Sequence, residues 1–285
     1  MPQSITLSLQ CPIRTGVSAR VSSFTAERGC IILEAQQFSD RESGRFFMRV
    51  VFDPQDNSAE TLRSEFAPLA RQFDMQWDLR DPDWMPRVVL MVSAFDHCLG
   101  DLLYRMRIGE LHMEVPAIIS NHPRETLTTS LMGDDIPYHH LPITKATKPQ
   151  QEEQVRQIVK ETRADLVVLA RYMQIFSDEM TQHLKGRCIN IHHSFLPGFK
   201  GAKPYHQAYE RGVKMIGATS HYVTSDLDEG PIIAQDVEPI THAESAEALV
   251  AKGRDVERRV LAKAVGAHLE DRVFLNGDRT VVFEN

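Results

Sequence analysis

Two polar side chains interrupt an apolar stretch in the middle of the chain. In "CINIHHSFLP", residues 188–197, Asn190 and His192 alternate with two isoleucines. Residues two apart on a strand project from the same face, so Asn190 and His192 should lie together and His193 should face away. An amide can donate to a developing oxyanion, and an imidazole can donate or move a proton. The pair therefore suits chemistry at a carbonyl, although a buried asparagine and histidine bonded to backbone would fit the same pattern.

An acidic loop downstream offers a third group. "TSDLDEGPIIAQD" places Asp226, Asp228 and Glu229 just before the Gly230-Pro231 turn. The carboxylate of Asp228 could hold an imidazolium or accept a proton from an attacking group. A solvated acidic turn would have the same composition, because Asp and Gly are common turn formers. The residues alone thus predict a carbonyl-directed site and leave the acceptor open.

These side chains must be positioned by a larger unit that begins near residue 87. From there, short apolar runs such as "RVVLMVS" and "ADLVVLA" alternate with amphipathic segments such as "QQEEQVRQIVKETR". The pattern predicts a doubly wound, mostly parallel α/β domain over residues 87–285. Ligands of such sheets bind beyond the carboxyl ends of the strands, where Asn190 and His192 stand. Asn276-Gly277, between two apolar runs, predicts a terminal hairpin in the same domain.

Residues 1–81 predict a separate α+β domain. Two helical segments, 17–28 and "SAETLRSEFAPLARQF", are interleaved with four strand-like runs in the order βαββαβ. This order predicts a ferredoxin-like fold, with a four-stranded antiparallel sheet and two helices on one face. "LRDPDWMPR" supplies a linker at residues 82–86.

Composition excludes several classes of protein. The formal net charge is −7 and no basic block occurs, so we expect no nucleic-acid partner. The apolar runs are too short for a membrane span, and the N-terminus lacks a secretory pattern. Four cysteines without a CxxC pair favour a reducing cytoplasm. The histidines lack metal-site spacing, and Cys98 beside His97 fits a buried thiol better than a nucleophile, so we expect no metal.

The two polar motifs carry a family resemblance. "NIHHSFLP" followed by "SDLDEGPIIAQ" resembles the folate-dependent formyltransferases, whose signature is Asn-x-His on a strand plus Asp in a D-x-G-P loop. The resemblance covers roughly residues 87–285 and implies catalytic roles for Asn190, His192 and Asp228. His221 in "SHYV" matches a histidine that supports the aspartate. "LARYMQIFS" resembles the folate-lining segment of the family, which implies substrate-binding roles for Met173, Gln174, Ile175 and Phe176.

Members of this family differ in their acceptor. Those that act on a ribonucleotide amine carry a glycine-rich phosphate loop after the first strand. Here "VSAFDHCLGDLLYR" has Phe95, Asp96 and His97 in that place, and an aspartate would repel a phosphate. The resemblance therefore implies that water is the acceptor: 10-formyltetrahydrofolate is hydrolysed to formate and tetrahydrofolate without a cofactor. This reaction would supply formate for purine synthesis and balance one-carbon folate pools. A formyltransferase with an amine acceptor and a non-enzymatic folate-binding sensor are the alternatives.

The N-terminal unit resembles an ACT domain, an amino-acid-sensing module. The resemblance rests on "CPIRTGVSARVSSFTAERGC" and implies an amino-acid effector bordered by Arg14, Thr15, Gly16 and Val17, residues that could also simply form the turn into a helix. Ile13 stands where such modules often have aspartate. The exposed sheet edge of the module favours a homo-oligomer. In the second domain, Lys200, Lys203 and His206 could attract the acidic tail of a folate or lie in a solvated loop.

Overall fold

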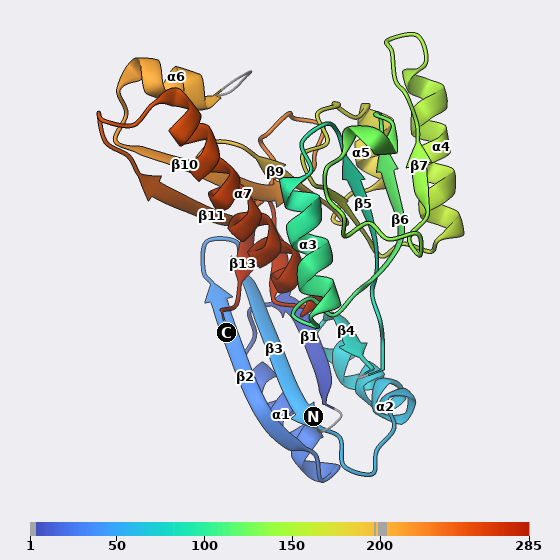
Figure 1. The fold of residues 1–285 in the computed structure, drawn as a ribbon. Helices are drawn as coiled ribbons and strands as arrows, with labels where there is room; N and C mark the ends of the chain where they lie inside the picture. The colour runs from blue at the N-terminus through green and yellow to red at the C-terminus, as the bar shows by residue number, and fades with distance from the viewer. Residues whose placement is uncertain (1–3, 82, 197, 199–203, 285) are drawn as a thin grey trace. The chain divides into compact units, whose positions relative to one another are not determined.

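The computed structural model describes residues 4–81, 83–196, 198 and 204–284 (Figure 1). Contacts between Cα atoms divide the chain into two compact units. One comprises Met1–Trp84 together with Glu270–Asn285, and the other comprises Met85–Leu269.

The first unit has the predicted βαββαβ order. Its elements are β1 (Ile5–Pro12), α1 (Val17–Glu27), β2 (Ile31–Asp40), β3 (Arg45–Asp53), α2 (Ala59–Gln72) and β4 (Gln76–Arg80). The strands form an antiparallel sheet in the order β2-β3-β1-β4. The prediction of a ferredoxin-like first domain is confirmed.

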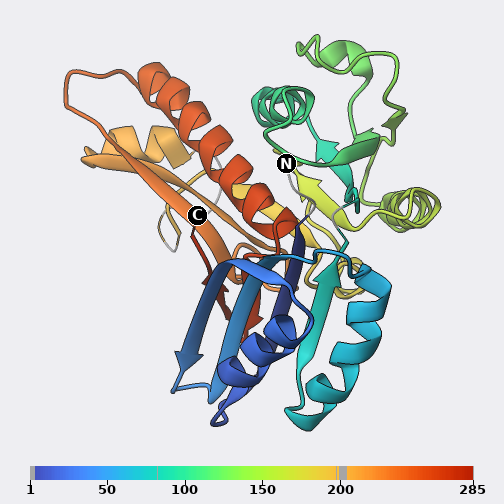
Figure 2. The same ribbon diagram turned by 90° about the horizontal axis from the view of Figure 1, so that it is seen from below.

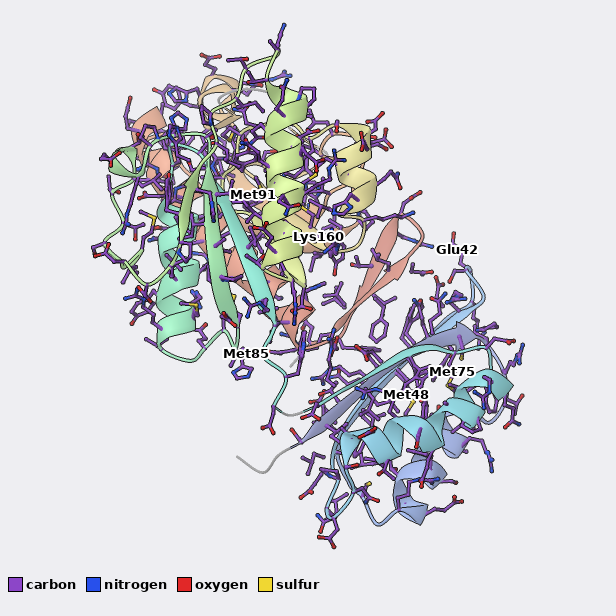
Figure 3. The ribbon with its side chains drawn as sticks, turned by 90° about the vertical axis from the view of Figure 1, so that its right-hand side faces the viewer. Glu42, Met48, Met75, Met85, Met91 and Lys160 are labelled. Atoms are coloured by element: carbon purple, nitrogen blue, oxygen red, sulfur yellow. The ribbon has the colours of Figure 1, made fainter. Side chains whose placement is uncertain are left out.

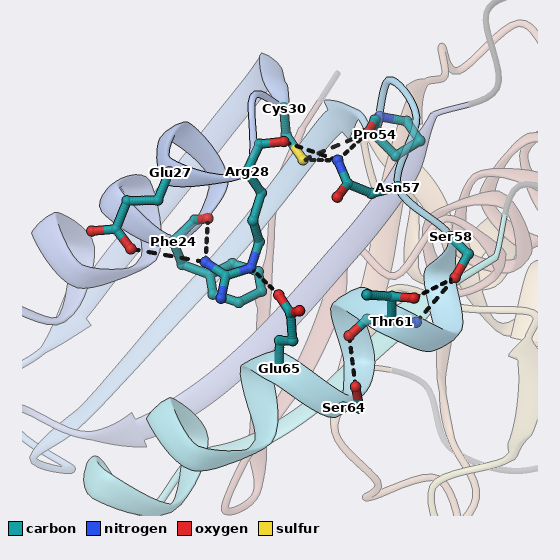
Figure 4. Close-up of polar contacts among 10 residues, drawn as sticks. All are labelled: Phe24, Glu27, Arg28, Cys30, Pro54, Asn57, Ser58, Thr61, Ser64 and Glu65. Carbon is teal, nitrogen blue, oxygen red and sulfur yellow. Dashed lines mark hydrogen bonds and ion pairs between the residues drawn. The ribbon is translucent and has the colours of Figure 1, made fainter.

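Both helices of this unit cover one face of the sheet. Alternate strand residues, Met48 among them, point into a core that α1 and α2 close, and Met75 packs at its edge (Figure 3). Arg28, at the end of α1, stacks on the Phe24 ring, donates to the Phe24 carbonyl and pairs with Glu65 of α2 (Figure 4). Asn57 donates to the carbonyls of Arg28 and Pro54 at 2.9 and 2.7 Å. The Arg28–Glu65 pair thus joins α1 to α2, and Asn57 joins the end of α1 to the loop that precedes α2.

The opposite face of the sheet is covered by the C-terminal hairpin, formed by β12 (Val273–Asn276) and β13 (Arg279–Val282). Phe47 points away from the helices and packs edge-on against Phe274, with ring centroids 5.8 Å apart, and Phe283 completes the cluster. Arg49 donates to the Glu270 carbonyl at 2.9 Å. The hairpin itself was predicted correctly, but its assignment to the second domain was wrong, because its apolar side chains complete the core of the first.

The second unit contains a seven-stranded sheet in the order β11-β10-β9-β8-β5-β6-β7. Its strands are β5 (Arg87–Val92), β6 (Glu114–Ser120), β7 (Tyr138–His140), β8 (Leu166–Leu169), β9 (Cys188–His192), β10 (Met215–Tyr222) and β11 (Ile232–Pro239). The five strands from β9 to β7 are parallel, whereas β10 and β11 are antiparallel additions at one edge. The mostly parallel sheet is thus confirmed.

Helices lie on both faces of this sheet. They are α3 (His97–Arg107), α4 (Lys148–Glu161), α5 (Asp178–His183), α6 (Pro204–Arg211) and α7 (Ala246–Leu269). Figure 2 shows α3 and α7 on one side of the sheet and α4 on the other, with α7 running along β10 and β11. Met91 of β5 points into the core that α4 and α5 close. The double covering explains why β5 and β8 are almost wholly apolar.

The order of the strands creates a binding crevice. The chain moves from β5 outward to β6 and β7, then returns to β8 and β9 on the other side of β5. Between β5 and β8 the connections therefore diverge, and ligands of α/β sheets bind at such a point.

Sequence patterns missed β7 and the short 3₁₀ helix η1 (Arg124–Thr126), because each is only three residues long. No helix in the described ranges is long and apolar enough to cross a membrane.

The placement of the hairpin can be tested by truncating Phe274. Phe274→Ala should lower the unfolding free energy of the first unit by about 3 kcal/mol, because it opens a cavity beside the buried Phe47. Both tryptophans, Trp77 and Trp84, lie in this unit, so their fluorescence during urea unfolding reports on it. Exposed Ile13→Ala is the control and should change the value by no more than about 0.5 kcal/mol. An unshifted tryptophan transition in Phe274→Ala would contradict the assignment.

Candidate active site

A cavity of about 320 Å³ opens at the carboxyl ends of β8 and β9. It brings together every residue for which the sequence predicts a catalytic, supporting or folate-binding role. They are Met173, Gln174, Ile175, Phe176, Asn190, His192, His221 and Asp228. The cavity lies at the crevice that the strand order creates.

Strand register places His221 opposite Asn190. The two residues are paired across β9 and β10, so their side chains share a face. The Nε2 atom of His221 lies 3.2 Å from the amide nitrogen of Asn190, and its Nδ1 lies 2.9 Å from the Tyr222 carbonyl. Since a carbonyl can only accept, Nδ1–H donates to it, and Nε2 accepts from the amide. His221 therefore orients Asn190 and leaves its second amide hydrogen for another acceptor.

His192 shares this face and reaches the acidic loop. Its Nδ1 lies 3.1 Å from an Asp228 carboxylate oxygen, and the other carboxylate oxygen lies 3.7 Å from Nε2 of His221. His192 is only 5% exposed, and its Nε2 has no hydrogen-bond partner among the described residues. Buried polar nitrogens are rarely left unpaired, so this atom is suited to binding an oxygen of a ligand.

Asp228 is held as a carboxylate. Burial raises the pKa of its carboxyl, but the hydrogen bonds and charges of His192 and His221 outweigh burial and bring the pKa well below its usual range. The group therefore carries a negative charge at neutral pH between two imidazoles. Because a carboxylate can only accept, Nδ1–H of His192 donates to it.

The acidic loop adopts a conformation that its sequence makes possible. Asp228 has a φ of 57°, in the left-handed region that aspartate tolerates better than most residues. A Cβ atom on Gly230 would lie 1.8 Å from the Tyr222 carbonyl oxygen, which is the atom bound by His221. Glycine is therefore required where the loop passes this carbonyl. Asp226 also lines the cavity but is exposed, as is Glu229.

The segment 173–176, for which the sequence predicts contact with folate, is bound to the sheet and, through Ser177, to α4. Its exposed residues, Met173 at 50% and Ile175 at 60%, offer apolar surface at the cavity. The hydroxyl of Ser93, just beyond β5, accepts from the Met173 backbone at 3.0 Å. Glu152 of α4 accepts from the Ser177 backbone and hydroxyl. Sequence reasoning missed Ser93 and Glu152, because neither belongs to a motif.

His193 does not face away from His192 as predicted. It also lines the cavity, and the two rings lie 5.2 Å apart between centroids. The expectation failed because β9 ends at His192, and the alternation of side chains ends with it. Burial, with the nearby Arg171 cation, lowers the pKa of His193 to about 4, so its imidazole is neutral at physiological pH.

A buried charged cluster borders His193, and sequence reasoning missed it as well. Glu257 of α7 is 1% exposed and accepts from His97 and from the Tyr205 hydroxyl. Arg171, which follows β8 and lines the cavity, places Nε 3.3 Å from the same carboxylate. These residues come from four separate segments, so no local pattern could have indicated the cluster.

His97, Cys98 and Glu257 lie close enough together to be considered as metal ligands. The carboxylate of Glu257 already accepts from His97 and Tyr205. Burial and the Glu257 charge raise the pKa of the Cys98 thiol well above its usual value, which disfavours a thiolate ligand. These contacts suit an ion-paired cluster better than a metal centre, and Cys98 is the buried thiol that the sequence predicts.

The remaining sequence-predicted residues lie elsewhere. Lys200 and Lys203 fall outside the described residues, and His206 is exposed on α6. In the first unit, Gly16 caps α1 with a φ of 87°, Val17 is buried and Thr15 is exposed. Arg14 pairs with Asp74 and donates to the Gln72 carbonyl at 3.1 Å. The turn into α1 is thus well ordered by its own contacts, and effector binding by it stays a prediction.

Comparison with known proteins agrees with the motifs. Residues 86–265 match the model of the formyl transferase family. The formyltetrahydrofolate deformylase of Corynebacterium sp. strain P-1 is 51% identical over 278 residues, which cover 97% of this chain and 96% of the relative.

Solved structures give the same picture. The formyltetrahydrofolate deformylase of Burkholderia mallei ATCC 23344 aligns with a TM-score of 0.94 at 51% identity, covering 99% of this chain and all of that one. Glycinamide ribonucleotide transformylase 1 of Symbiobacterium toebii aligns with a TM-score of 0.62 at 28% identity, covering 70% of this chain and 95% of that one.

The charge on Asp228 makes a testable contribution to stability. A carboxyl with a lowered folded-state pKa stabilises the fold above its unfolded pKa of about 4, and this contribution is lost as pH falls toward the folded value. Asp228→Asn should therefore be less stable than wild type by a constant amount from pH 8 to about pH 5, with the difference shrinking at lower pH. Urea unfolding followed by circular dichroism measures this difference. Exposed Asp226→Asn is the control, and a pH-independent difference in Asp228→Asn would argue against the ion pair.

Proposed function

The chain belongs to the formyl transferase family and, within it, to the formyltetrahydrofolate deformylases, and from this membership we propose how its cavity works. The protein hydrolyses 10-formyltetrahydrofolate to formate and tetrahydrofolate. The observation that carries the mechanism is the convergence of Asn190, His192 and Asp228 on one cavity, with two donors and one carboxylate.

Asn190 and His192 polarise the formyl group. His221 occupies one amide hydrogen of Asn190, and the other hydrogen donates to the formyl oxygen. His192 keeps Nδ1–H on Asp228, and when Nε2 also carries a hydrogen it donates to the same oxygen. Negative charge then develops on an oxygen that already faces two donors, and such preorganised donors stabilise it more in the transition state than before reaction.

Asp228 relays the proton that the reaction must move. Water attacks the formyl carbon, its oxygen forms the new C–O bond, and one of its protons passes to the carboxylate. The tetrahedral intermediate then collapses: the C–N bond to the folate breaks, and the proton passes from Asp228 to the departing nitrogen. The lowered pKa of Asp228 ensures that the carboxylate begins each cycle unprotonated and gives the proton up readily.

Asp96 supports water rather than a ribonucleotide as the acceptor. It precedes α3, and its carboxylate accepts from the backbone of Thr129 at 2.7 Å and from the backbone and hydroxyl of Thr128. The negative charge is therefore fixed close to the place where a phosphate-binding loop would lie, and it opposes a phosphate there.

The proposed mechanism needs neither metal nor cofactor, because side chains supply both the oxyanion donors and the proton relay. We place the reaction in the cytoplasm, where the four buried free thiols of the described chain would remain reduced. The formate released would serve purine synthesis, and the tetrahydrofolate would return to the one-carbon folate pool.

We further propose that the first unit is an ACT-type regulatory module. Its βαββαβ fold supports this role. Arg14, Thr15, Gly16 and Val17 would border the amino-acid effector, beside the turn that Arg14 fastens to Asp74.

The protein should also form a homo-oligomer through this unit. Strand β2 lies at the edge of its sheet and pairs only with β3 among the described strands. It exposes Ile31 at 54%, Leu33 at 54% and Phe38 at 47%, although edge strands usually carry charge or are covered. A ten-residue edge strand with exposed apolar side chains is suited to pairing with the same strand of a second copy.

The function is tested by incubating the purified protein with 10-formyltetrahydrofolate and no amine. Formate should accumulate, whereas a transferase would release none. Asn190→Ala should lower kcat by about 10²–10³-fold through loss of one oxyanion donor, and Gln157→Ala, which removes an exposed amide from α4, should not. Near-normal turnover in a folded Asn190→Ala protein would refute the assigned role.

The oligomer is tested by light scattering. We expect a mass at least twice the 32.4 kDa of one chain. Phe38→Lys, which places a charge on the edge strand, should shift the protein toward monomer, whereas Ile108→Lys on the second unit should not. A wild-type monomer would contradict the proposal.

A further inference from the structure

His193 lies in the active-site cavity but has no part in the mechanism so far. Its ring lies beside that of His192, and an edge contact of 6.3 Å between centroids joins it to Tyr205. Neither of its ring nitrogens hydrogen-bonds to a residue in the described part of the chain. A histidine that lines a catalytic cavity with both nitrogens uncommitted can bind a reactant.

Arg171 is held against this histidine at a conformational cost. Its φ of 66° lies in the left-handed region, where an arginine backbone is strained. The side chain is nevertheless 91% buried, beside the carboxylate of Glu257. Strain of this kind persists only where surrounding contacts enforce it, and it is concentrated at functional sites.

Glu257 supplies those contacts. The carboxyl is buried, which raises its pKa, but the hydrogen bond from His97 and the charge of Arg171 outweigh burial and lower it. His97 from α3 and Tyr205 from α6 bind it at 2.8 and 2.7 Å. A Cβ atom on Gly253, one turn earlier on α7, would lie 2.1 Å from the Tyr205 ring, so glycine makes room for this arrangement. The guanidinium is therefore a buried cation, paired with this carboxylate at 3.3 Å, and two of its nitrogens have no hydrogen-bond partner among the described residues.

We propose that His193 is a further catalytic residue of the hydrolysis, with its neutral imidazole accepting a hydrogen bond from the attacking water. This inference rests on the proposed function, in which Asp228 takes the proton that is transferred. The other hydrogen of the same water donates to His193 and remains on oxygen. A water held through both hydrogens directs its lone pairs away from the two acceptors, toward the formyl carbon.

Arg171 and Glu257 are positioning residues in this scheme. Only an imidazole with an unprotonated nitrogen can accept the hydrogen bond. Among the described residues, the charged and titratable groups that face His193 are Arg171, Glu257, His192, Asp228 and Tyr205, and burial raises the pKa of the Tyr205 hydroxyl so that it stays protonated. Burial contributes most to the lowered pKa of His193; Arg171 and His192 lower it further, and Glu257 and Asp228 oppose them. The buried guanidinium thus helps to keep His193 neutral, and its positive charge disfavours the approach of cationic amine substrates.

The first experiment compares two nucleophiles. His193→Ala should lower kcat for hydrolysis by about 10²-fold, the low end for a positioned proton-accepting group, with KM for 10-formyltetrahydrofolate little changed. Transfer of the formyl group to hydroxylamine, a stronger nucleophile, should fall much less. His193→Gln, which keeps a hydrogen-bond acceptor, should recover part of the lost hydrolysis. His183→Gln, on α5 and outside the cavity lining, is the matched control.

The second experiment follows kcat against pH. Arg171→Gln should raise the pKa of His193, so the acidic limb of the profile should move to higher pH and hydrolysis at pH 6 should fall relative to wild type. The double variant Arg171→Gln/Glu257→Gln leaves no buried unpaired charge and serves if the single variant does not fold. Its acidic limb should move in the same direction by a smaller amount. Adding His193→Gln to either variant should abolish the shift.

Two outcomes would overturn the proposal. One is an equal loss of hydrolysis and hydroxylamine transfer in folded His193→Ala, because His193 would then support the formyl-binding groups and not the water. The other is an acidic limb that does not move in either Arg171 variant. Failure of the proposed function would look different, since wild-type protein would then release no formate without an amine.

Discussion

The site depends on one half-buried carboxylate, that of Asp228, held between two imidazoles. Removing an unpaired carboxylate from water is strongly unfavourable, so Asp228 can be buried only where donors and positive charge surround it. His192, at the end of β9, donates to it through Nδ1, and Nε2 of His221 on β10 lies 3.7 Å from its other oxygen. The antiparallel pairing that sets His221 opposite Asn190 also sets Thr219 opposite His192, so one register positions the whole group. A slip of one residue would turn all of these side chains to the other face.

The same constraint explains where the chain accepts backbone strain. Asp228 and Arg171 both adopt left-handed φ angles, and both line the cavity. Each brings a charged side chain to a place that extended or helical backbone would not reach: one to the two imidazoles, the other to the carboxylate of Glu257. The energy that offsets this strain comes from the packing of the surrounding sheet and of the helix faces turned toward it, which are buried. Catalytic geometry is therefore maintained by a scaffold much larger than the reacting groups.

The sequence predicts those parts of the site that depend on contacts between residues close together in the chain, and it misses those that depend on residues far apart. Asn190 and His192 could be paired from strand periodicity alone, and the βαββαβ order followed from local patterns. The loop composition made Asp228 a candidate but left a solvated acidic turn open, and the family resemblance then implied roles for Asp228 and for residues 173–176. The placement of the hairpin failed because Phe274 and Phe47 are distant in sequence, and only three-dimensional packing joins them. Arg171 and Glu257 were missed for the same reason, and His193 because periodicity stops where its strand ends.

These long-range contacts bear on how one fold can serve two reactions. A glycinamide ribonucleotide transformylase shares much of the second unit's fold at 28% identity, yet its name implies an amine acceptor. Polarising a formyl oxygen is required whether the nucleophile is water or an amine, so oxyanion donors such as Asn190 and His192 do not by themselves choose between them. The choice must be made by groups that contact the nucleophile or its substituents. In the mechanism proposed for this chain, those groups are the carboxylate of Asp96 and the neutral imidazole of His193 beside a buried guanidinium, so acceptor specificity would be determined by charges outside the Asn-x-His motif.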